Sequence, residues 1–421
     1  MEELRNKVAQ AVHVLNHDSQ STNRAAANEW LVQFQQTDWV WQVATSILSS
    51  PSSGCADFEL HFFAAQILKN KIHEEGRLLS LGVRDTVYNS LLSSAKRFSS
   101  GPPQLLTQVC LALAALMLQT VEHGKPIEQL FGNLRSLECE LGGDIAVLEM
   151  LTILPEEVSD TPKHDTRTSL EQRCLYGREL LSQTPAVLEF LAEESLKSCD
   201  GGLQFERSKK VLRCLLSWVR AGCLSEIPNT SLGTHPLLNF IFKSLMNSSL
   251  FSLAIEVLIE IVSHHEEFTR IIFGRVSHLS ERILFPALCE GNDSVVHGVA
   301  CLLVEIGQAV RLLRLVVLLL EERTLFVFYS LTIIALFNVF KVPYVVVEAG
   351  VEARLLFEAL LRCTSFPTAE WGIADITLQF WSGLAHCIFS LQTMDKLNRD
   401  HVEEIFYPLF SALLDAIIQR A

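Results

Sequence analysis

The chain has 421 residues, of which 49% are apolar and 19% are charged. This composition excludes a largely disordered protein, and the length predicts several domains or an extended array of repeats. The net charge of −14 disfavours nucleic acid and anionic membranes as direct partners, since the longest basic run is Lys209-Lys210 with Arg207 and Arg213 nearby. The 11 cysteines include no CxxC pair, which indicates reduced thiols in a cytosolic or nuclear protein.

Helical periodicity runs through almost the whole chain, with apolar residues three and four positions apart. The expected helices, in chain order, are residues 4–15, 23–36, 39–49, 59–73, 78–98, 104–121, 127–141, 144–154, 168–181, 186–197, 205–221, 236–246, 250–264, 267–276, 281–289, 293–308, 351–363, 373–391 and 401–419. Pairs of helices recur about every 40 residues, which favours stacked HEAT- or armadillo-like repeats over a compact helical bundle.

Particular residues mark several helix boundaries. Asp38 is placed to cap the third helix by accepting backbone N–H bonds. The helix before Pro155 is expected to stop there, because proline lacks the N–H group that a helix interior needs. Thr168 and Glu171 have the spacing of a capping box, and residues 200–202 (Asp-Gly-Gly) indicate a turn. The apolar helix over 104–121 is expected to be buried and short of a membrane span.

The segment Glu59–His73 (ELHFFAAQILKNKIH) divides into two sides when it is wound as a helix. One side is apolar and needs a surface to pack on. The opposite side carries Phe62, Gln66, Lys69, Asn70 and His73. A phenylalanine among polar groups is a possible contact for a partner, but single exposed aromatic residues are ordinary. The pattern alone therefore favours the solvated face of a structural helix.

Residues 310–347 differ from the rest of the chain. The uncharged run Thr324–Phe340 reaches the lower limit of a membrane span, about 17 residues. Tyr344–Val347 has the β-branched and aromatic composition that favours a strand. A membrane anchor, a buried repeat helix and a segment foreign to the fold are the three interpretations of this stretch.

Sequence motifs for catalysis or metal binding do not stand out above background. The chain has no GxGxxG, GxxxxGK[ST], GxSxG or HExxH pattern. His264-His265-Glu266-Glu267 could supply metal ligands, but adjacent helical residues point about 100° apart, so a polar helix end is the better interpretation. We therefore expect no enzyme activity, no cofactor and no metal.

Longer stretches of the sequence resemble a known family. Residues 27–48 (ANEWLVQFQQTDWVWQVATSIL), followed by 62–72 (FFAAQILKNKI), resemble the N-terminal domain of importin-β-type proteins. Three further stretches are similar to the transportin-SR branch of nuclear transport receptors: 146–158, 210–228 and 359–381. The resemblance covers residues 1–309 and 351–421, and residues 311–347 match nothing in the family pattern.

The resemblance implies an all-α, right-handed superhelical solenoid of HEAT-like helix pairs, each with an outer A helix and an inner B helix. Residues 23–36 would be the first B helix and 59–73 the second. Four parts follow from it: importin-β-type N-terminal repeats (1–122), further repeats (123–309), an atypical hydrophobic insert (310–350), and helices of a truncated end (351–421).

The resemblance also implies a function: a non-enzymatic import receptor that shuttles between cytoplasm and nucleus. Such a receptor binds the GTP form of the small GTPase Ran, contacts nucleoporins and carries arginine/serine-rich cargo such as splicing factors, which an acidic surface would attract. The implied Ran-binding candidates are Asn28, Val32 and Gln35 on the first B helix and Phe62, Gln66, Lys69, Asn70 and His73 on the second. The rival interpretations are a generic helical scaffold from a truncated splice form and a membrane-tethered adaptor.

Overall fold

The computed structural model describes residues 1–50, 55–138, 143–159, 169–197, 201–226, 233–309, 346–367, 372–394 and 399–420. Within these ranges every regular element is a helix and there is no strand. The predicted all-α fold of HEAT-like helix pairs is confirmed. Contacts between residues divide the chain into two units, residues 1–226 and 227–421. The domain boundaries expected at residues 122 and 309 stay predictions.

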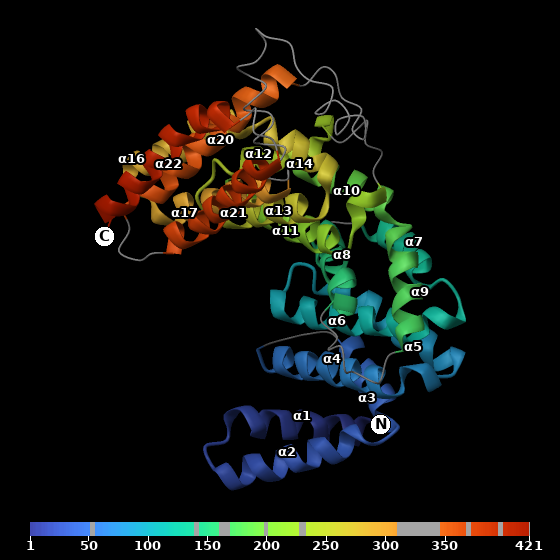
Figure 1. Ribbon diagram of the computed structural model, residues 1–421. Helices are drawn as coiled ribbons and strands as arrows, with labels where there is room; N and C mark the ends of the chain where they lie inside the picture. The colour runs from blue at the N-terminus through green and yellow to red at the C-terminus, as the bar shows by residue number, and fades with distance from the viewer. Residues whose placement is uncertain are drawn as a thin grey trace. The chain divides into compact units, whose positions relative to one another are not determined.

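The first unit is a stack of helix pairs (Figure 1). Its elements are α1 (Glu2–His17), α2 (Ser21–Gln35), α3 (Trp39–Ser49), α4 (Cys55–Glu75), η1 (Gly76–Leu78), α5 (Leu81–Arg97), α6 (Pro103–Thr120), η2 (Val121–His123), α7 (Pro126–Glu138), α8 (Gly143–Ser159), α9 (Leu170–Leu181), α10 (Thr184–Leu196), α11 (Gly201–Arg220) and η3 (Cys223–Glu226). Helices α4, α6, α8 and α11 pack on one another in that order and form one layer. Helix α3 pairs with α4, α5 with α6, and α7 with α8.

Helix α6 is the centre of this unit. It packs against α4 on one side and α8 on the other, and nearly all of its side chains from Leu105 to Thr120 are buried. By length and composition it could cross a membrane, but a core helix covered by neighbours has the same composition. Because 72% of its apolar window is buried inside the unit, we interpret it as that core helix, as the sequence predicts.

Helix α8 continues through Pro155 to Ser159, so the predicted end before this proline is wrong. A proline inside a helix frees the carbonyl four residues earlier, which is that of Leu151. The indole nitrogen of Trp218 donates a hydrogen bond to this carbonyl (2.8 Å), and the Ser217 hydroxyl donates to the next one, of Thr152 (2.7 Å). The Trp218 side chain of α11 thus satisfies the backbone carbonyl that the proline leaves open.

Three further local predictions need correction. Asp38 is at the N-cap position of α3, but its backbone is α-helical and its side chain makes no capping bond. The capping box of α9 lies one residue later than expected: Ser169 accepts from the Gln172 backbone N–H, and the Gln172 side chain accepts from that of Ser169. Gly201 and Gly202 belong to the first turn of α11, so no turn separates them from that helix.

The second unit has the same pairwise architecture. Its elements in the described ranges are α12 (Pro236–Ser244), α13 (Phe251–His264), α14 (Glu266–Phe273), α15 (Val276–Leu279), the π-helical turn η5 (Ser280–Leu284), α16 (Phe285–Glu290), α17 (Asp293–Ala309), α20 (Val346–Ser365), α21 (Gly372–Met394) and α22 (Arg399–Arg420). Helices α13, α17 and α21 form one layer, and α20 packs on α21 and α22. Val346 and Val347 begin α20, which corrects the predicted strand at these two positions.

The layer of the second unit continues across the atypical segment. Helix α17 ends at Ala309 and packs directly on α21, which begins at Gly372. Their contact is so close that a Cβ atom on Gly307 would overlap the Phe380 ring. The helices before and after the segment therefore belong to one packed unit. The run Thr324–Phe340 itself lies outside the described residues.

Candidate functional site

The apolar side of α4 is buried as the sequence predicts, at positions that include Ala64, Leu68 and Ile72. Two polar residues, His61 and Lys71, are buried as well, because α4 has neighbours on several sides: α1, α3 and α6. The helix is therefore covered more completely than a surface helix with one apolar stripe, and only the polar side predicted from the sequence offers accessible groups.

The buried polar side chains of α4 are satisfied within the unit. The His61 imidazole lies 3.3 Å from the Ser50 carbonyl oxygen and meets the Phe98 ring edge-on, with centroids 5.3 Å apart. The Lys71 ammonium donates to the Glu75 carboxylate one turn later (2.5 Å). The amphipathic pattern of the sequence gives no signal for either contact, since both residues sit at helical positions that could equally have faced water.

The polar side of α4 carries the five candidate residues, which the structure keeps on one face. Gln66 and Asn70 are exposed, and Phe62 and Lys69 are half-buried. The Phe62 ring lies against that of Phe58 one turn earlier, with centroids 6.0 Å apart and planes inclined by 37°. Aromatic side chains that are partly exposed and held by a neighbour lose little conformational entropy when a partner covers them.

His73, the last candidate on α4, is the least available of the five. Its Nε2 atom lies 3.3 Å from the carboxylate of Glu157 on α8, and both side chains are largely buried. The candidate face of α4 thus ends in a polar contact inside the unit. A partner that used His73 would compete with this contact.

The three candidates on α2, Asn28, Val32 and Gln35, also share one face of their helix. Asn28 and Val32 are exposed, and Gln35 is half-buried. Helix α1 packs on both α2 and α4, and Glu59 of α4 accepts hydrogen bonds across this α1–α4 contact. The layer formed by α4 and α6 therefore continues through α1. The candidates on α2 and those on α4 thus do not lie on adjacent helices of that layer.

A second polar cluster, which the sequence did not reveal, links three successive helices of the layer. The Glu149 carboxylate on α8 accepts from the Thr107 hydroxyl on α6 (2.6 Å) and from the Lys210 ammonium on α11 (2.9 Å). Burial acts to raise the Glu149 pKa, but the hydrogen bonds from Lys210 and Thr107 outweigh it and lower the pKa. The ion pair is therefore present at neutral pH and joins the repeats.

The only basic run singled out in the sequence is divided by this cluster. Arg207, one turn before Lys210, pairs with Asp144 (2.5 Å) and also with Glu194. Lys209 lies between these two residues, Arg213 lies one turn after Lys210, and both are exposed. Because two of its four cations are paired with acids, the run forms no concentrated patch for a phosphate backbone.

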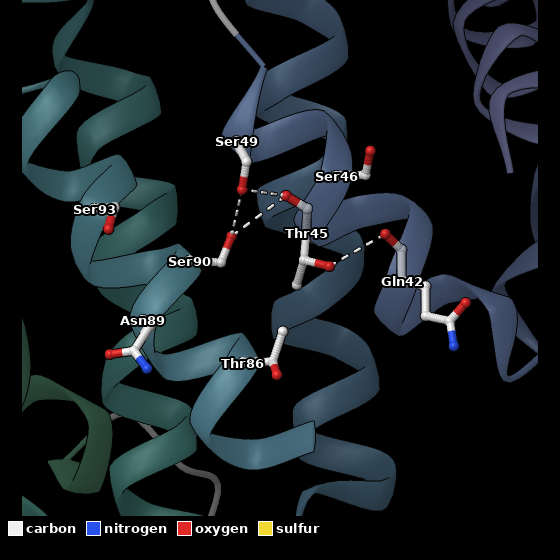
Figure 2. Close-up of a pocket in the computed structure, with 8 residues that line it drawn as sticks. All are labelled: Gln42, Thr45, Ser46, Ser49, Thr86, Asn89, Ser90 and Ser93. Carbon is white, nitrogen blue, oxygen red and sulfur yellow. Dashed lines mark hydrogen bonds between the residues drawn. The ribbon is translucent and has the colours of Figure 1, made fainter. Parts of the chain in front are cut away.

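A shallow polar groove runs between α3 and α5 (Figure 2). Its lining consists of small hydroxyl and amide side chains: Gln42, Thr45, Ser46, Ser49, Thr86, Asn89, Ser90 and Ser93. Several hydroxyls bond to helix carbonyls; Ser49, for example, donates to the carbonyl of Thr45 (2.8 Å). The lining has no acid, base or cation, so the groove can offer hydrogen bonds to a polar surface but no general acid–base chemistry.

Among the described residues, no group of three or more His, Cys, Asp or Glu side chains could hold a metal ion. Cys110, Cys214, Cys223 and Cys363 are buried free thiols, and burial raises the pKa of each, to about 12 for Cys223. A buried thiol with a raised pKa has little nucleophilic thiolate. These four thiols are therefore poor nucleophiles at neutral pH.

The fold and these faces define a protein of stacked helical repeats, and comparison with known proteins identifies the class further. The importin-beta N-terminal domain family matches residues 27–95, which contain all eight candidate residues. The exportin 1-like protein family matches residues 102–258.

Relatives match over larger parts of the chain. Transportin MOS14 of Arabidopsis thaliana is 31% identical over 264 residues, 62% of this chain and 26% of its own. Importin-13 of Bos taurus is 24% identical over 98% of this chain, and the mRNA transport regulator MTR10 of Saccharomyces cerevisiae is 29% identical over 71%. These matches cover 39% and 31% of the relatives, so the chain spans about two fifths or less of their length. The chain is thus similar to importin-β-type and exportin 1-like proteins over these parts of its length.

Proposed function

We propose that this chain acts as the N-terminal part of a nuclear transport receptor of the transportin-SR branch, moves between cytoplasm and nucleus, and binds Ran-GTP. The observation that carries the proposal is the coincidence of the importin-beta N-terminal match at 27–95 with the accessible polar face of α4. Relatives named transportin, importin-13 and mRNA transport regulator support a role in transport. The receptor works by binding, without an enzymatic step.

The face of α4 is the main contact in this proposal. Phe62 supplies apolar area that Phe58 holds in place, while Lys69, Gln66 and Asn70 supply a charge and hydrogen bonds around it. A half-buried aromatic residue with a polar surround is the usual composition of an interface centre. Asn28, Val32 and Gln35 on α2 form a second contact, which a GTPase would reach across α1.

The cargo in this proposal is basic, with arginine/serine-rich segments as its class, and nucleoporins contact the outer helices. The net charge of −14 supports this assignment, because an acidic surface attracts an arginine-rich chain and speeds its association. Ran-GTP and cargo bound to one helical stack then lower each other's affinity by the same factor, as reciprocal linkage requires. Binding of Ran-GTP then promotes the release of cargo.

A pull-down of the 421-residue chain with GTP-loaded and GDP-loaded Ran tests the proposal. We expect strong recovery with GTP-Ran, weak recovery with GDP-Ran, and about a tenfold loss in the double variant Phe62→Ala plus Lys69→Glu. The matched control is Met246→Ala plus Lys243→Glu, since both residues are exposed and lie in the second unit. Equal recovery with both nucleotides, or equal loss in both variants, would favour a generic helical scaffold instead.

A further inference from the structure

Three serines of the chain follow an arginine by three positions: Ser80, Ser100 and Ser365. Protein kinases of the basophilic class select their acceptor serines by such a pattern of charge. Phosphoryl transfer also needs the acceptor hydroxyl in line with the γ-phosphate of ATP, so the serine and its neighbours must be free to enter the kinase cleft. All three serines are exposed, and the contacts around each of them decide which one meets this requirement.

The arginine before Ser100 is held by the neighbouring helix. The Arg97 guanidinium donates to the carbonyls of Ser50 (2.8 Å) and Leu48 at the end of α3. It also lies over the Phe98 ring, 4.5 Å from the ring centroid. A kinase that bound Arg97 would leave two carbonyls of a helix end without this donor.

The segment around Ser365 is held by its own helix. Ser365 is the last residue of α20, and its hydroxyl donates to the carbonyl of Arg362 (3.1 Å). The next residue, Phe366, is buried. Presenting this serine therefore requires the end of α20 to unfold and a core side chain to become exposed.

Ser80 lies in the short connection between η1 and α5, where no such contact holds it. The backbone of Leu79 and Ser80 is extended, with ψ of 131° and 151°, and the Ser80 hydroxyl makes no hydrogen bond with the described residues. The leucines on either side, Leu78 and Leu81, are 85% and 70% exposed. A free hydroxyl thus lies between a cation and a large apolar side chain, both of which a kinase can read.

Arg77, three residues before Ser80, can leave its partner at small cost. Its guanidinium donates two hydrogen bonds to the Glu122 carboxylate of η2 (2.8 and 3.1 Å). The two side chains are 42% and 28% exposed, and ion pairs this open to water contribute little to stability. An acidic pocket of a kinase can therefore bind Arg77 in place of Glu122.

We propose that Ser80 is a phosphorylation site for a basophilic protein kinase that reads Arg77 three residues before the acceptor and Leu81 one residue after it. The Ser80 Oγ atom attacks the γ-phosphorus of ATP. The new O–P bond forms as the bond from that phosphorus to the bridging oxygen breaks, ADP leaves, and the hydroxyl proton passes to the aspartate base of the kinase. The site is independent of the proposed transport role.

The modification also changes a contact within the first unit. A phosphoserine carries about 1.5 to 2 negative charges at pH 7 and accepts strong hydrogen bonds from arginine. On Ser80 it competes with Glu122 for the Arg77 guanidinium and repels the Glu122 carboxylate. Phosphorylation therefore loosens the contact between η1 and η2.

Mass spectrometry of the full chain after incubation with ATP, Mg²⁺ and a calmodulin-dependent kinase of the basophilic class tests the site. We expect Ser80 to be modified about tenfold faster than Ser100 or Ser365, and Arg77→Gln to slow this reaction about tenfold. The matched control is Arg24→Gln, a change at an exposed arginine of α2, which should leave the rate unchanged. An unmodified Ser80, or a rate that Arg77→Gln does not lower, overturns the proposal.

Hydrogen exchange of the phosphorylated chain tests the effect on the η1–η2 contact. Peptides over residues 121–126 should exchange several-fold faster than in the unmodified chain, with those over 143–159 unchanged. The Ser80→Ala variant, treated with the same kinase, should show no such change. Equal exchange over 121–126 before and after modification would contradict the competition for Arg77.

Discussion

In the unit of residues 1–226, buried polar contacts join neighbouring helices of the layer: Trp218 and Ser217 of α11 donate to α8 carbonyls, and Lys210 pairs with Glu149. In the unit of residues 227–421, close apolar packing joins them, with Gly307 of α17 against the Phe380 ring of α21. The first kind of contact fixes the register by hydrogen-bond geometry, and the second by shape. The same repeat architecture can thus be held by either means.

The largest effect is expected when a buried polar contact of the first unit is broken. Trp218→Phe removes the donor to the Leu151 carbonyl and leaves a small cavity, so we expect about 3 kcal/mol of destabilisation of the first unit. Hydrogen exchange followed by mass spectrometry should show faster exchange over 143–159 and 201–220, with the peptides of 346–394 unchanged.

A second substitution sharpens this test. Pro155→Ala restores a backbone N–H four residues after Leu151, so in the Trp218→Phe background it should recover about 1 kcal/mol. In the wild type, where Trp218 already donates to the Leu151 carbonyl, Pro155→Ala should increase the free energy of unfolding by much less. A double-mutant cycle with no coupling would contradict the role assigned to Trp218.

The second prediction concerns the close apolar contact between α17 and α21 in the second unit. Gly307→Ala places a Cβ atom 2.3 Å from Cε2 of Phe380, and overpacking of this kind costs about 1–3 kcal/mol. Thermal unfolding and hydrogen exchange over 293–309 and 372–394 should both report the loss. The control is Gly177→Ala in α9, where a Cβ would meet no atom within 4 Å and the helix should gain up to about 1 kcal/mol. Equal behaviour of the two variants would refute the close contact.

The smallest expected effect is on the pH dependence of stability, to which two acids of the first unit contribute in opposite directions. The pKa of Glu149 is lowered from its ordinary value of 4.5, so its contribution to stability is present above pH 4.5 and is lost as the pH falls through the lowered value. The pKa of Glu179 is raised by burial, although the backbone N–H groups of Ile127 and Glu128 donate to it, so acidification through its raised value favours the folded state.

Urea unfolding between pH 3 and pH 7 measures how the free energy of unfolding changes with pH in the wild type and in each variant. Glu149→Gln should reduce the loss of stability on acidification, and Glu179→Gln should increase it, by about 1 kcal/mol or less in each case. A Glu149→Gln variant that loses as much stability on acidification as the wild type, or more, would show that the contacts of Glu149 do not stabilise its charged form.

The sequence by itself determined the helical class, the pairing of helices and the apolar side of most helices, because these depend on periodicity within one segment. The buried stripe of α4 and the uniformly apolar α6 are examples. Helix ends were less predictable. Pro155 is tolerated inside α8 because Trp218, distant in sequence, donates to the carbonyl that the proline leaves without an N–H partner.

Only the tertiary structure decided which polar residues are available. Gln66 and Asn70 stay exposed, whereas His73 contacts Glu157 and the basic run is divided by Asp144 and Glu149. It also decided that α1 rather than α2 adjoins α4, and that α17 packs on α21 across the atypical segment. These outcomes depend on contacts between segments tens of residues apart, which local periodicity cannot encode.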